Sequence, residues 1–561
     1  TKINQLAAAS KNNEPGIKRQ HTLQPLKDIH FYSNDIEGYS GRKGDISYIY
    51  VFCIIALFVL LIACINYMNL TTARFANRAK EIAIRKVAGA SRGRLTGQFL
   101  TEAFLLTTVA LLLALMLVKL LLPSFNAFTE KQLTLNNQTD FRIYAGVFII
   151  FIITGLLSGM YPALFQSAAK PLLLLKNKVN IGKGNLSMRR SLVVFQFALS
   201  IIMIIATIVV YMQMKYVSTK DMGFNKEQLL VVDINSGKIR QSAEAIKTSF
   251  AALAQVKNVS VSSRVPGEWK DLPKVKVKNE KIQTPEGDDM YFIGVDDQFL
   301  ETFQIDLLQG RNFAAGSIAD SSAVLINETA AKALGITQPS EQLIEIPLDQ
   351  PFKASVIGIV KDFNFQSLRE PLAPMVLGFQ KNPVQSIDYF AVRVTTDNMS
   401  KTLRQMDAVL HSFDQNHLFE YHFLDKQWEL FYREDRVRET IFLIVAILTI
   451  VIACLGLFGL ATYAAEQRIK EIGIRKVLGA SVSSIVSMLS ADFLKLVCIA
   501  AVIAFPVAWL AMNKWLADFA YRIHISWWIF VIAGITAFLI ALFTISFQAI
   551  KAAVSNPVKS L

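Results

Sequence analysis

Two nearly identical charged segments decide how this chain folds: "KEIAIRKVAGAS" at residues 80–91 and "KEIGIRKVLGAS" at residues 470–481. Ten of the twelve positions are the same in both copies. Each copy follows a long apolar run and precedes another one. The chain therefore contains a duplicated unit in which a charged element is set between apolar segments.

Apolar runs dominate the rest of the sequence. Of the 561 residues, 53% are hydrophobic and only 18% are charged, which is not the balance of an ordinary soluble protein. A run of about 20 apolar residues spans the hydrocarbon core of a bilayer, which is about 30 Å thick. The fold class that we expect is an α-helical integral membrane protein with about seven transmembrane helices, near residues 48–72, 97–122, 143–166, 191–213, 439–463, 491–513 and 526–548.

A long stretch of mixed polarity separates the fourth apolar run from the fifth. It contains strand-like segments such as "LLVVDI" and "ASVIGIV", and amphipathic helix-like segments such as "MSKTLRQMDAVLHSF". We therefore expect an inserted α+β extracytoplasmic domain. The predicted divisions are a polar N-terminal region, a first membrane unit of three helices, an incoming helix, the inserted domain and a second membrane unit, at residues 1–45, 46–190, 191–213, 214–436 and 437–561.

The positive charge of the chain indicates its orientation in the membrane. The net charge is +14, and much of it lies in short connections beside the apolar runs, which argues against nucleic acid as the partner. Short connections rich in Lys and Arg face the cytoplasm. We therefore expect the charged segments on the cytoplasmic side and the inserted domain on the outer side of the membrane. The apolar runs between them are expected to contact membrane lipids. All four cysteines fall in apolar runs, so we expect buried free thiols at Cys53, Cys64, Cys454 and Cys498.

The charged segment has the pattern of a short amphipathic helix. Ala83, Ile84, Val87 and Ala88 form an apolar stripe, and charged residues gather on another side. A glycine is placed to end the helix and a serine to cap the next one: Gly89 and Ser91, with Gly479 and Ser481 in the second copy. A basic membrane anchor would also have this pattern. The identity of the two copies instead favours a surface that a protein partner recognises.

These residues carry a family resemblance. The stretches "RAKEIAIRKVAGASRGRLTGQFLTEA" and "QRIKEIGIRKVLGASVSSIVSMLSADF" resemble the signature of the MacB and FtsX type of ABC transporter permease. The similarity continues through "SGMYPALFQSAAKP" and "MGFNKEQLLVVDI". The resemblance implies a tandem permease in the cell inner membrane, with a periplasmic domain and eight spans. Because we find seven runs, and "LQPLKDIHFYSN" resembles the end of a first periplasmic domain, we expect an N-terminally incomplete chain.

The resemblance also implies a partner and a set of contact residues. In this family the charged segment is the coupling helix that contacts a cytoplasmic ABC ATPase, here a homodimer because there are two segments. A periplasmic adaptor or an outer-membrane component is a further implied partner. The residues that match the coupling helices are Lys80, Glu81, Ile84, Arg85, Lys86, Gly89, Lys470, Glu471, Ile474, Arg475, Lys476 and Gly479.

No catalytic pattern stands out in the sequence. It has no Gly-x-x-x-x-Gly-Lys-Ser/Thr motif, so we expect no enzyme and no cofactor here, with ATP bound by the partner. The nearby His411, His417 and His422 lack the cysteines or paired carboxylates of a metal site. Aromatic residues of the inserted domain could line a cargo groove, although core packing is the usual fate of such residues: Trp269, Tyr291, Phe292, Phe299, Phe303, Phe363 and Phe365.

The function that we expect is that of a permease subunit. It would transmit the motion of a separate ATPase to the periplasmic domain, for export or extraction of a drug, peptide or lipoprotein. One alternative is an FtsX-like transmembrane regulator that activates cell-wall hydrolases. The other is a membrane scaffold or receptor that has no ATPase, in which the two charged segments are only anchors.

Overall fold

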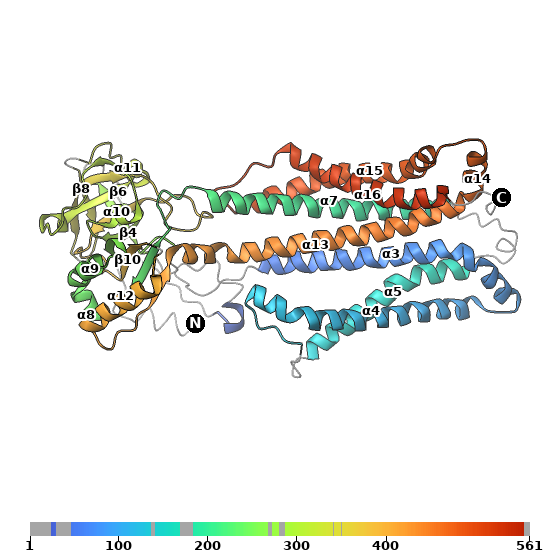
Figure 1. Ribbon diagram of the computed structural model, residues 1–561, viewed down its shortest axis with the longest axis horizontal. Helices are drawn as coiled ribbons and strands as arrows, with labels where there is room; N and C mark the ends of the chain where they lie inside the picture. The colour runs from blue at the N-terminus through green and yellow to red at the C-terminus, as the bar shows by residue number, and fades with distance from the viewer. Residues whose placement is uncertain are drawn as a thin grey trace, which may run out of the picture.

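The computed structural model describes residues 24–29, 46–135, 141–168, 183–267, 272–279, 287–339, 342–348, 350–395 and 397–554. The molecule is elongated, with an α/β domain at one end and long helices that run away from it (Figure 1). Of the predicted N-terminal region, only residues 24–29 belong to this part of the chain.

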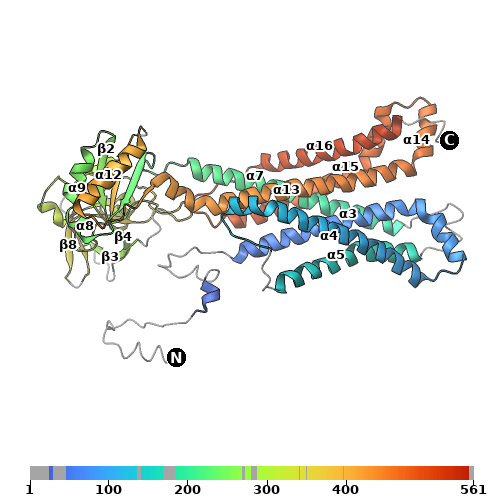
Figure 2. The same ribbon diagram turned by 60° about the horizontal axis from the view of Figure 1, so that its bottom comes forward.

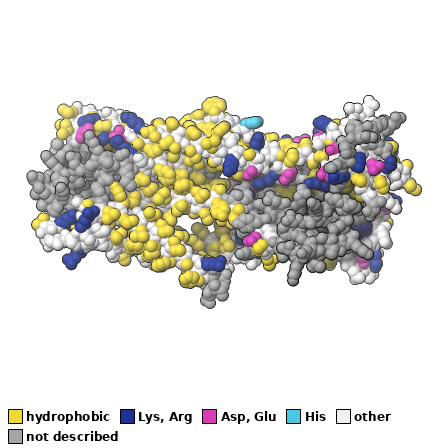
Figure 3. Space-filling view, turned by 180° about the vertical axis from the view of Figure 1, so that it is seen from behind, with side chains coloured by type: hydrophobic (Ala, Val, Ile, Leu, Met, Phe, Trp, Pro, Cys, Tyr) yellow, Lys and Arg dark blue, Asp and Glu magenta, His cyan; other side chains and the backbone are white. Residues whose placement is uncertain are grey.

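Seven helices in the described ranges are long and apolar enough to cross a membrane, as predicted. Their exposed side chains form a broad hydrophobic band between the domain and the far end of the molecule (Figure 3). A bilayer covers such a surface, because water would otherwise contact it. The seven are α3 (Ile46–Val87), α4 (Arg92–Thr129), α5 (Phe141–Ala168), α7 (Lys183–Thr219), α13 (Leu424–Gln467), α15 (Val482–Leu516) and α16 (Trp527–Val554).

The membrane helices form two groups that reflect the sequence repeat. Helices α3, α4 and α5 pack together, and α7 packs with α13, α15 and α16. The groups meet where α3 contacts α13, its counterpart in the repeat. Small residues at every fourth position of α15, namely Ala500, Ala504 and Ala508, are fully buried in the core of the second group. Such residues let helices approach closely in a membrane.

The four cysteines are free, as predicted, but they are not all buried. Cys64 is buried and Cys454 is partly buried, whereas Cys53 and Cys498 are exposed on the surface of the helices. The expectation of buried thiols is therefore wrong for these last two. In a membrane protein the outer surface is as apolar as the core, so an apolar run does not show which of its residues lie inside.

The inserted domain is a mixture of strands and helices, and the predicted α+β layout is confirmed. Its strands are β1 (Leu229–Asp233), β2 (Val256–Ser262), β3 (Lys274–Asn279), β4 (Asp288–Val295), β5 (Leu307–Gly310), β6 (Ala323–Asn327), β7 (Leu343–Ile346), β8 (Phe352–Val360), β9 (Met375–Phe379), β10 (Tyr389–Val394) and β11 (Tyr421–Phe423). Its helices are α8 (Gly237–Gln241), α9 (Ala243–Ala251), α10 (Phe299–Phe303), α11 (Glu328–Ala333) and α12 (Met399–Phe413).

All of these strands belong to one sheet. β4, β3, β7, β8, β6 and β9 are paired in turn, and β9 pairs in parallel with β4, so that the six close into a ring. β2, β10, β1 and β11 continue antiparallel from β4. Helices α9 and α12 cover this extension: Phe250 of α9 stacks edge-on against Phe390 of β10, with ring centroids 5.5 Å apart, and Met406 of α12 joins the same core.

Helix α13 connects the domain to the membrane without interruption. It begins at Leu424, directly after β11, and continues for 44 residues. Its first turns place Trp428 and Tyr432 in the core of the domain, where Trp428 is 1% exposed. The predicted division between residues 436 and 437 falls inside this helix.

Candidate functional site

Both charged segments lie at the end of the helices that is farthest from the domain (Figure 2). We call residues 78–91 the first tip and residues 468–481 the second tip. The second tip contains a short helix of its own, α14 (Ile469–Val477), separated from α13 at Arg468. The first tip does not, because α3 continues to Val87. The prediction of a separate short helix is wrong for the first tip, where α3 is one uninterrupted helix from the span to Val87.

One ion pair fastens each tip to the following helix. Arg78 forms two hydrogen bonds with the carboxylate of Glu102 on α4, of 2.9 and 3.2 Å. At the equivalent positions of the second tip, Arg468 lies 3.2 Å from Asp492 on α15. The charge pattern is thus repeated in space as well as in sequence.

A second ion pair lies within each tip, one helical turn apart in sequence. Arg85 is 2.7 Å from Glu81, and Arg475 is 2.7 Å from Glu471. These arginines also reach different neighbours on the next helix. The guanidinium of Arg85 donates to the amide oxygen of Gln98, at 2.6 Å.

The partner of Arg475 on the next helix is the sulfur atom of Met488, at 2.9 Å.

The side chains of the two ion pairs within the tips are all between 44% and 50% exposed, so their charges remain available to a partner. Surface pairs of this kind contribute at most about 1 kcal/mol to folding stability, which argues for a role beyond stability.

Each tip ends in the predicted turn. Gly89 and Gly479 have φ angles of 91° and 92°, a left-handed conformation that favours glycine. The next N–H closes the turn: Ala90 donates to the Arg85 carbonyl at 3.0 Å, and the second tip repeats this bond. The hydroxyls of Ser91 and Ser481 then cap α4 and α15. The predicted helix ends and caps are confirmed.

The apolar stripe of the tips is divided differently from the prediction. Ile82 and Ala83 are buried against the bundle, at 3% and 0% exposure, whereas Ile84 and Val87 are 63% and 70% exposed. The stripe differs because Ile82, and not Ile84, lies on the side of α3 that faces α4 and α5. The second tip likewise buries Ile472 and exposes the side chains of Ile474, Val477 and Leu478, the last at 80%. Each tip therefore presents exposed apolar side chains beside exposed charges.

The tip lysines complete the set of predicted contact residues. Lys86 donates to the carbonyl oxygen of Ser167 at the end of α5, at 2.6 Å. Partial burial lowers the pKa of the Lys86 ammonium group, and Arg92 adds to this effect. Lys476 is partly buried at the equivalent position of the second tip. The side chains of Lys80 and Lys470 lie outside the described residues.

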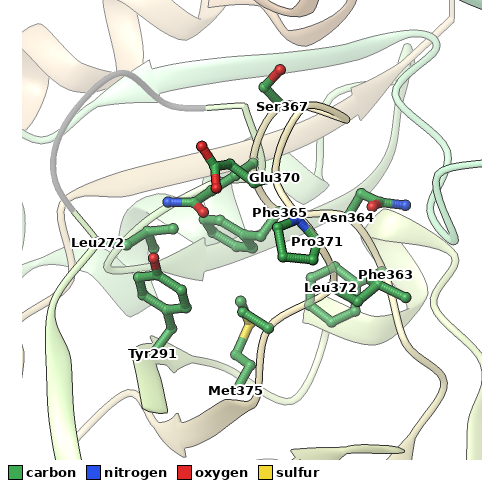
Figure 4. Close-up of a pocket in the computed structure, with 12 residues that line it drawn as sticks. Leu272, Tyr291, Phe363, Asn364, Phe365, Ser367, Glu370, Pro371, Leu372 and Met375 are labelled. Carbon is green, nitrogen blue, oxygen red and sulfur yellow. The ribbon is translucent and has the colours of Figure 1, made fainter. Parts of the chain in front are cut away.

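The aromatic residues considered for a cargo groove pack mostly in the domain core. Phe292, Phe299 and Phe303 are fully buried there. Tyr291 and Phe365 also line a small pocket, with Phe363 beside them (Figure 4). The pocket is bounded largely by the loop between β8 and β9, including Glu370, Leu372 and other loop residues. Trp269 lies outside the described residues.

A further cluster, which sequence patterns did not predict, lies where the domain meets the membrane helices. Arg369 in the loop between β8 and β9 contacts Asp435 on α13 and Phe519 in the α15–α16 connection. The three residues come from segments far apart in sequence, so no local spacing relates them. Arg369 and Asp435 each belong to a charged stretch that resembles an ordinary solvated surface.

Comparison with known families covers both membrane units and the inserted domain. The FtsX-like permease C-terminal family matches residues 53–171 and again residues 443–557, which confirms the duplication. The MacB-like periplasmic core domain family matches residues 192–409.

Individual relatives match shorter stretches. The macrolide export ATP-binding/permease protein MacB of Sodalis glossinidius (strain morsitans) is 26% identical over 157 residues, which cover 28% of this chain and 23% of that protein. The protein of the same name from Pasteurella multocida (strain Pm70) is 28% identical over 124 residues, covering 22% of this chain and 19% of that protein. The matched region thus spans less than a quarter of either relative.

A solved structure is also similar to part of the chain. The periplasmic region of MacB from Actinobacillus actinomycetemcomitans aligns with 37% of this chain and 94% of its own length, at 14% identity and a TM-score of 0.28. The two family matches together span the repeated membrane units with their charged tips and the α+β domain between them. The chain belongs to the MacB/FtsX-type ABC transporter permeases, as a multi-pass membrane protein with a large periplasmic domain.

Proposed function

We propose that the chain is the permease subunit of a transporter that is driven by a separate ABC ATPase in the cytoplasm. In this proposal the two tips dock onto the two subunits of an ATPase homodimer, and closure of the dimer on ATP moves the tips. The membrane helices carry the motion to the periplasmic domain, which exports or extracts a drug, peptide or lipoprotein from the inner membrane or the periplasm. A periplasmic adaptor or outer-membrane component would receive the substrate.

One observation carries this proposal: the two tips present the same side chains at the same end of the molecule. The pairs Glu81 with Arg85 and Glu471 with Arg475 have the same geometry. Exposed apolar residues lie next to both pairs. A membrane anchor requires positive charge and an apolar face, but it does not require the same acidic residue in both copies. A pair of identical protein surfaces does require it.

The continuity of the helices supports transmission across the membrane. The first tip is the end of α3 itself, and α14 follows α13 after a single residue. Helix α13 then reaches the core of the periplasmic domain through Trp428. A movement of the second tip therefore has a continuous route to the domain, through packed elements with few intervening loops.

Charge reversal at the tips tests the docking. The full chain is purified in detergent together with its ATPase. The ATP hydrolysis activity of the co-purified ATPase is then measured and divided by the amount of permease. Arg85→Glu together with Arg475→Glu is expected to abolish co-purification, because each change places a second negative charge beside Glu81 or Glu471. Arg94→Glu is the matched control: Arg94 is exposed in the same connection, but its counterpart is the uncharged Ser484.

The possible outcomes of this experiment distinguish the permease from the scaffold and from the regulator. Unchanged ATPase binding in the double variant would remove the docking role and favour a scaffold whose tips are anchors. Lost binding with undiminished export would remove the transport role. Lost binding accompanied by lost activation of a cell-wall hydrolase, without any effect on export, would favour the regulator.

A further inference from the structure

In the loop between β8 and β9, Arg369 forms a buried ion pair with a membrane helix. Arg369 forms hydrogen bonds with both carboxylate oxygens of Asp435 on α13, at 2.6 and 2.8 Å. The side chain of Asp435 is only 4% exposed, and Arg438 provides a second guanidinium contact at 2.8 Å. A buried carboxylate requires such partners, so this contact has a defined geometry and resists separation.

The same arginine also holds the connection between α15 and α16. Its guanidinium lies over the ring of Phe519, 4.6 Å from the centroid, and its carbonyl oxygen accepts a 3.1 Å hydrogen bond from the N–H of Ala520. Phe519 is 2% exposed. Arg369 therefore joins three parts of the protein: the periplasmic domain, α13 and the α15–α16 connection. The neighbouring Leu368 adds a bond from its N–H to the hydroxyl of Tyr432 on α13, at 2.8 Å.

The α15–α16 connection is fixed on its other side by α7. The side chain of Gln213 donates to the carbonyl of Tyr521 at 2.8 Å and accepts from the N–H of Ile523 at 3.0 Å. The ammonium group of Lys220 lies 4.4 Å from the centroid of the Tyr521 ring. The connection thus contacts both α7 and the domain.

In the first membrane unit, the described end of α4 makes a different contact, at Glu130. Glu130 forms an ion pair with Arg433 on α13, and not with the domain loop. The outer end of the first unit therefore contacts the helix, whereas that of the second unit contacts the domain through Arg369.

We propose that Arg369 is a positioning residue that couples the periplasmic domain to the α15–α16 connection. This inference rests on the proposed function. When ATP closure moves the second tip, α15 moves with it, and Arg369 makes the domain follow the outer end of α15 as well as α7 and α13. The second membrane unit is then the one that sets the orientation of the domain.

The test measures whether the domain and the connection move together. The full chain is reconstituted in lipid nanodiscs in complex with its ATPase, with the four native cysteines changed to serine. Nitroxide labels are attached at Ser400→Cys on α12 and at Asp518→Cys in the α15–α16 connection. Both positions are exposed. The distance between the labels is measured by pulsed electron paramagnetic resonance, without nucleotide and with ATP plus vanadate.

We expect this distance to stay constant on nucleotide trapping in the parent chain and to shift in Arg369→Leu. Arg369→Lys keeps the charge but not the paired hydrogen bonds, and we expect a smaller shift. Phe519→Leu removes the ring and leaves the ion pair, so it provides a second, milder variant. Arg311→Leu is the control, because it breaks a comparable pair with Asp320 inside the domain, of 2.7 and 3.1 Å, and is expected to leave the distance constant.

A second label pair separates failure of this inference from failure of the proposed function. Gly93→Cys and Ser483→Cys occupy equivalent positions next to the two tips. If nucleotide changes the distance between these labels but Arg369→Leu still keeps the domain and the connection together, Arg369 has no coupling role. If nucleotide does not change the distance between the tips in the parent chain, the proposed ATPase coupling itself is wrong.

Discussion

The side-chain amide of Asn66 on α3 donates a 2.5 Å hydrogen bond to the carbonyl oxygen of Ile452 on α13. The same side chain lies against Gly456, and residue 456 is the counterpart of residue 66 in the repeat. The two membrane units thus meet where equivalent positions face each other. Because one position carries an amide and the other no side chain, the helices approach closely at this point.

Substitution of Gly456 should weaken the contact between the two units. In Gly456→Ala the new methyl group overlaps the Asn66 side chain, and we expect a loss of about 1 to 3 kcal/mol in stability, as for other overpacked sites. The measurement is the thermal unfolding temperature of the full chain in detergent.

The control for this prediction is Gly97→Ala on α4, where nothing lies within 4 Å of the new methyl group. Alanine is the better helix former by up to about 1 kcal/mol, so no loss is expected. Combining Gly456→Ala with Asn66→Gly should restore part of the stability. Equal unfolding temperatures for Gly456→Ala and the parent chain would contradict the close packing.

The glycine that ends the second tip should be sensitive to substitution for conformational reasons alone. Gly479 has a φ of 92° and open space around it, so Gly479→Ala introduces strain without a collision. A strain of about 1 kcal/mol corresponds to roughly fivefold weaker ATPase binding if the turn must be kept in the complex. Gly479→Asn should bind better than Gly479→Ala, because asparagine tolerates this conformation. The same affinity for both variants would contradict the prediction.

The two docking surfaces are expected to differ in apolar contact. Leu478 is 80% exposed, and its counterpart in the first tip is Ala88. Burial of a leucine against the ATPase contributes about 1.5 to 3 kcal/mol, so Leu478→Ala should weaken binding by roughly tenfold or more. Ala88→Leu should strengthen it. If neither substitution alters the affinity of the purified complex, the exposed apolar residues of the tips are not part of the interface.

Mild acid should destabilise the periplasmic domain through His417. This side chain is 4% exposed, and burial lowers its pKa below the ordinary value of 6.5, although Asp414 opposes the effect. Its contribution to stability is complete above the unfolded pKa and is lost as the pH falls through that value toward the folded one, because the unfolded chain takes up the proton first.

The measurement for His417 is the unfolding temperature of the full chain between about pH 7.5 and about pH 5.5. His417→Gln should lose less stability over this interval than the parent chain. His411→Gln, which changes a side chain that is 46% exposed and paired with Asp407, should respond like the parent chain. A steeper loss in His417→Gln would contradict the assignment.

Those parts of the fold that follow from local patterns were predictable. Seven apolar runs gave seven helices, because the thickness of the bilayer sets the length of a span. Gly89 and Ser91 marked the ends of two helices correctly, because left-handed turns and N-caps depend on single residues. Two strands of the domain, β1 and β8, followed from the apolar patterns of "LLVVDI" and "ASVIGIV".

Other features depend on which surfaces meet, and the sequence alone does not specify this. The exposed positions of Ile84 and Cys53 could not be predicted, because lipid, core and partner surfaces are all apolar. The contact of Arg369 with Asp435 joins residues 66 positions apart in sequence, and each has the composition of a solvated surface. Whether the tips bind an ATPase remains a prediction.

The continuity of α13 has a geometric consequence. At 1.5 Å per residue its 44 residues form a rod about 66 Å long, with one end in the core of the domain and the other directly beside the second tip. A tilt of only about 5° at one end displaces the other by about 6 Å. If the proposed coupling holds, a small angular change in the cytoplasm would become a stroke as large as a helical turn on the opposite side of the membrane.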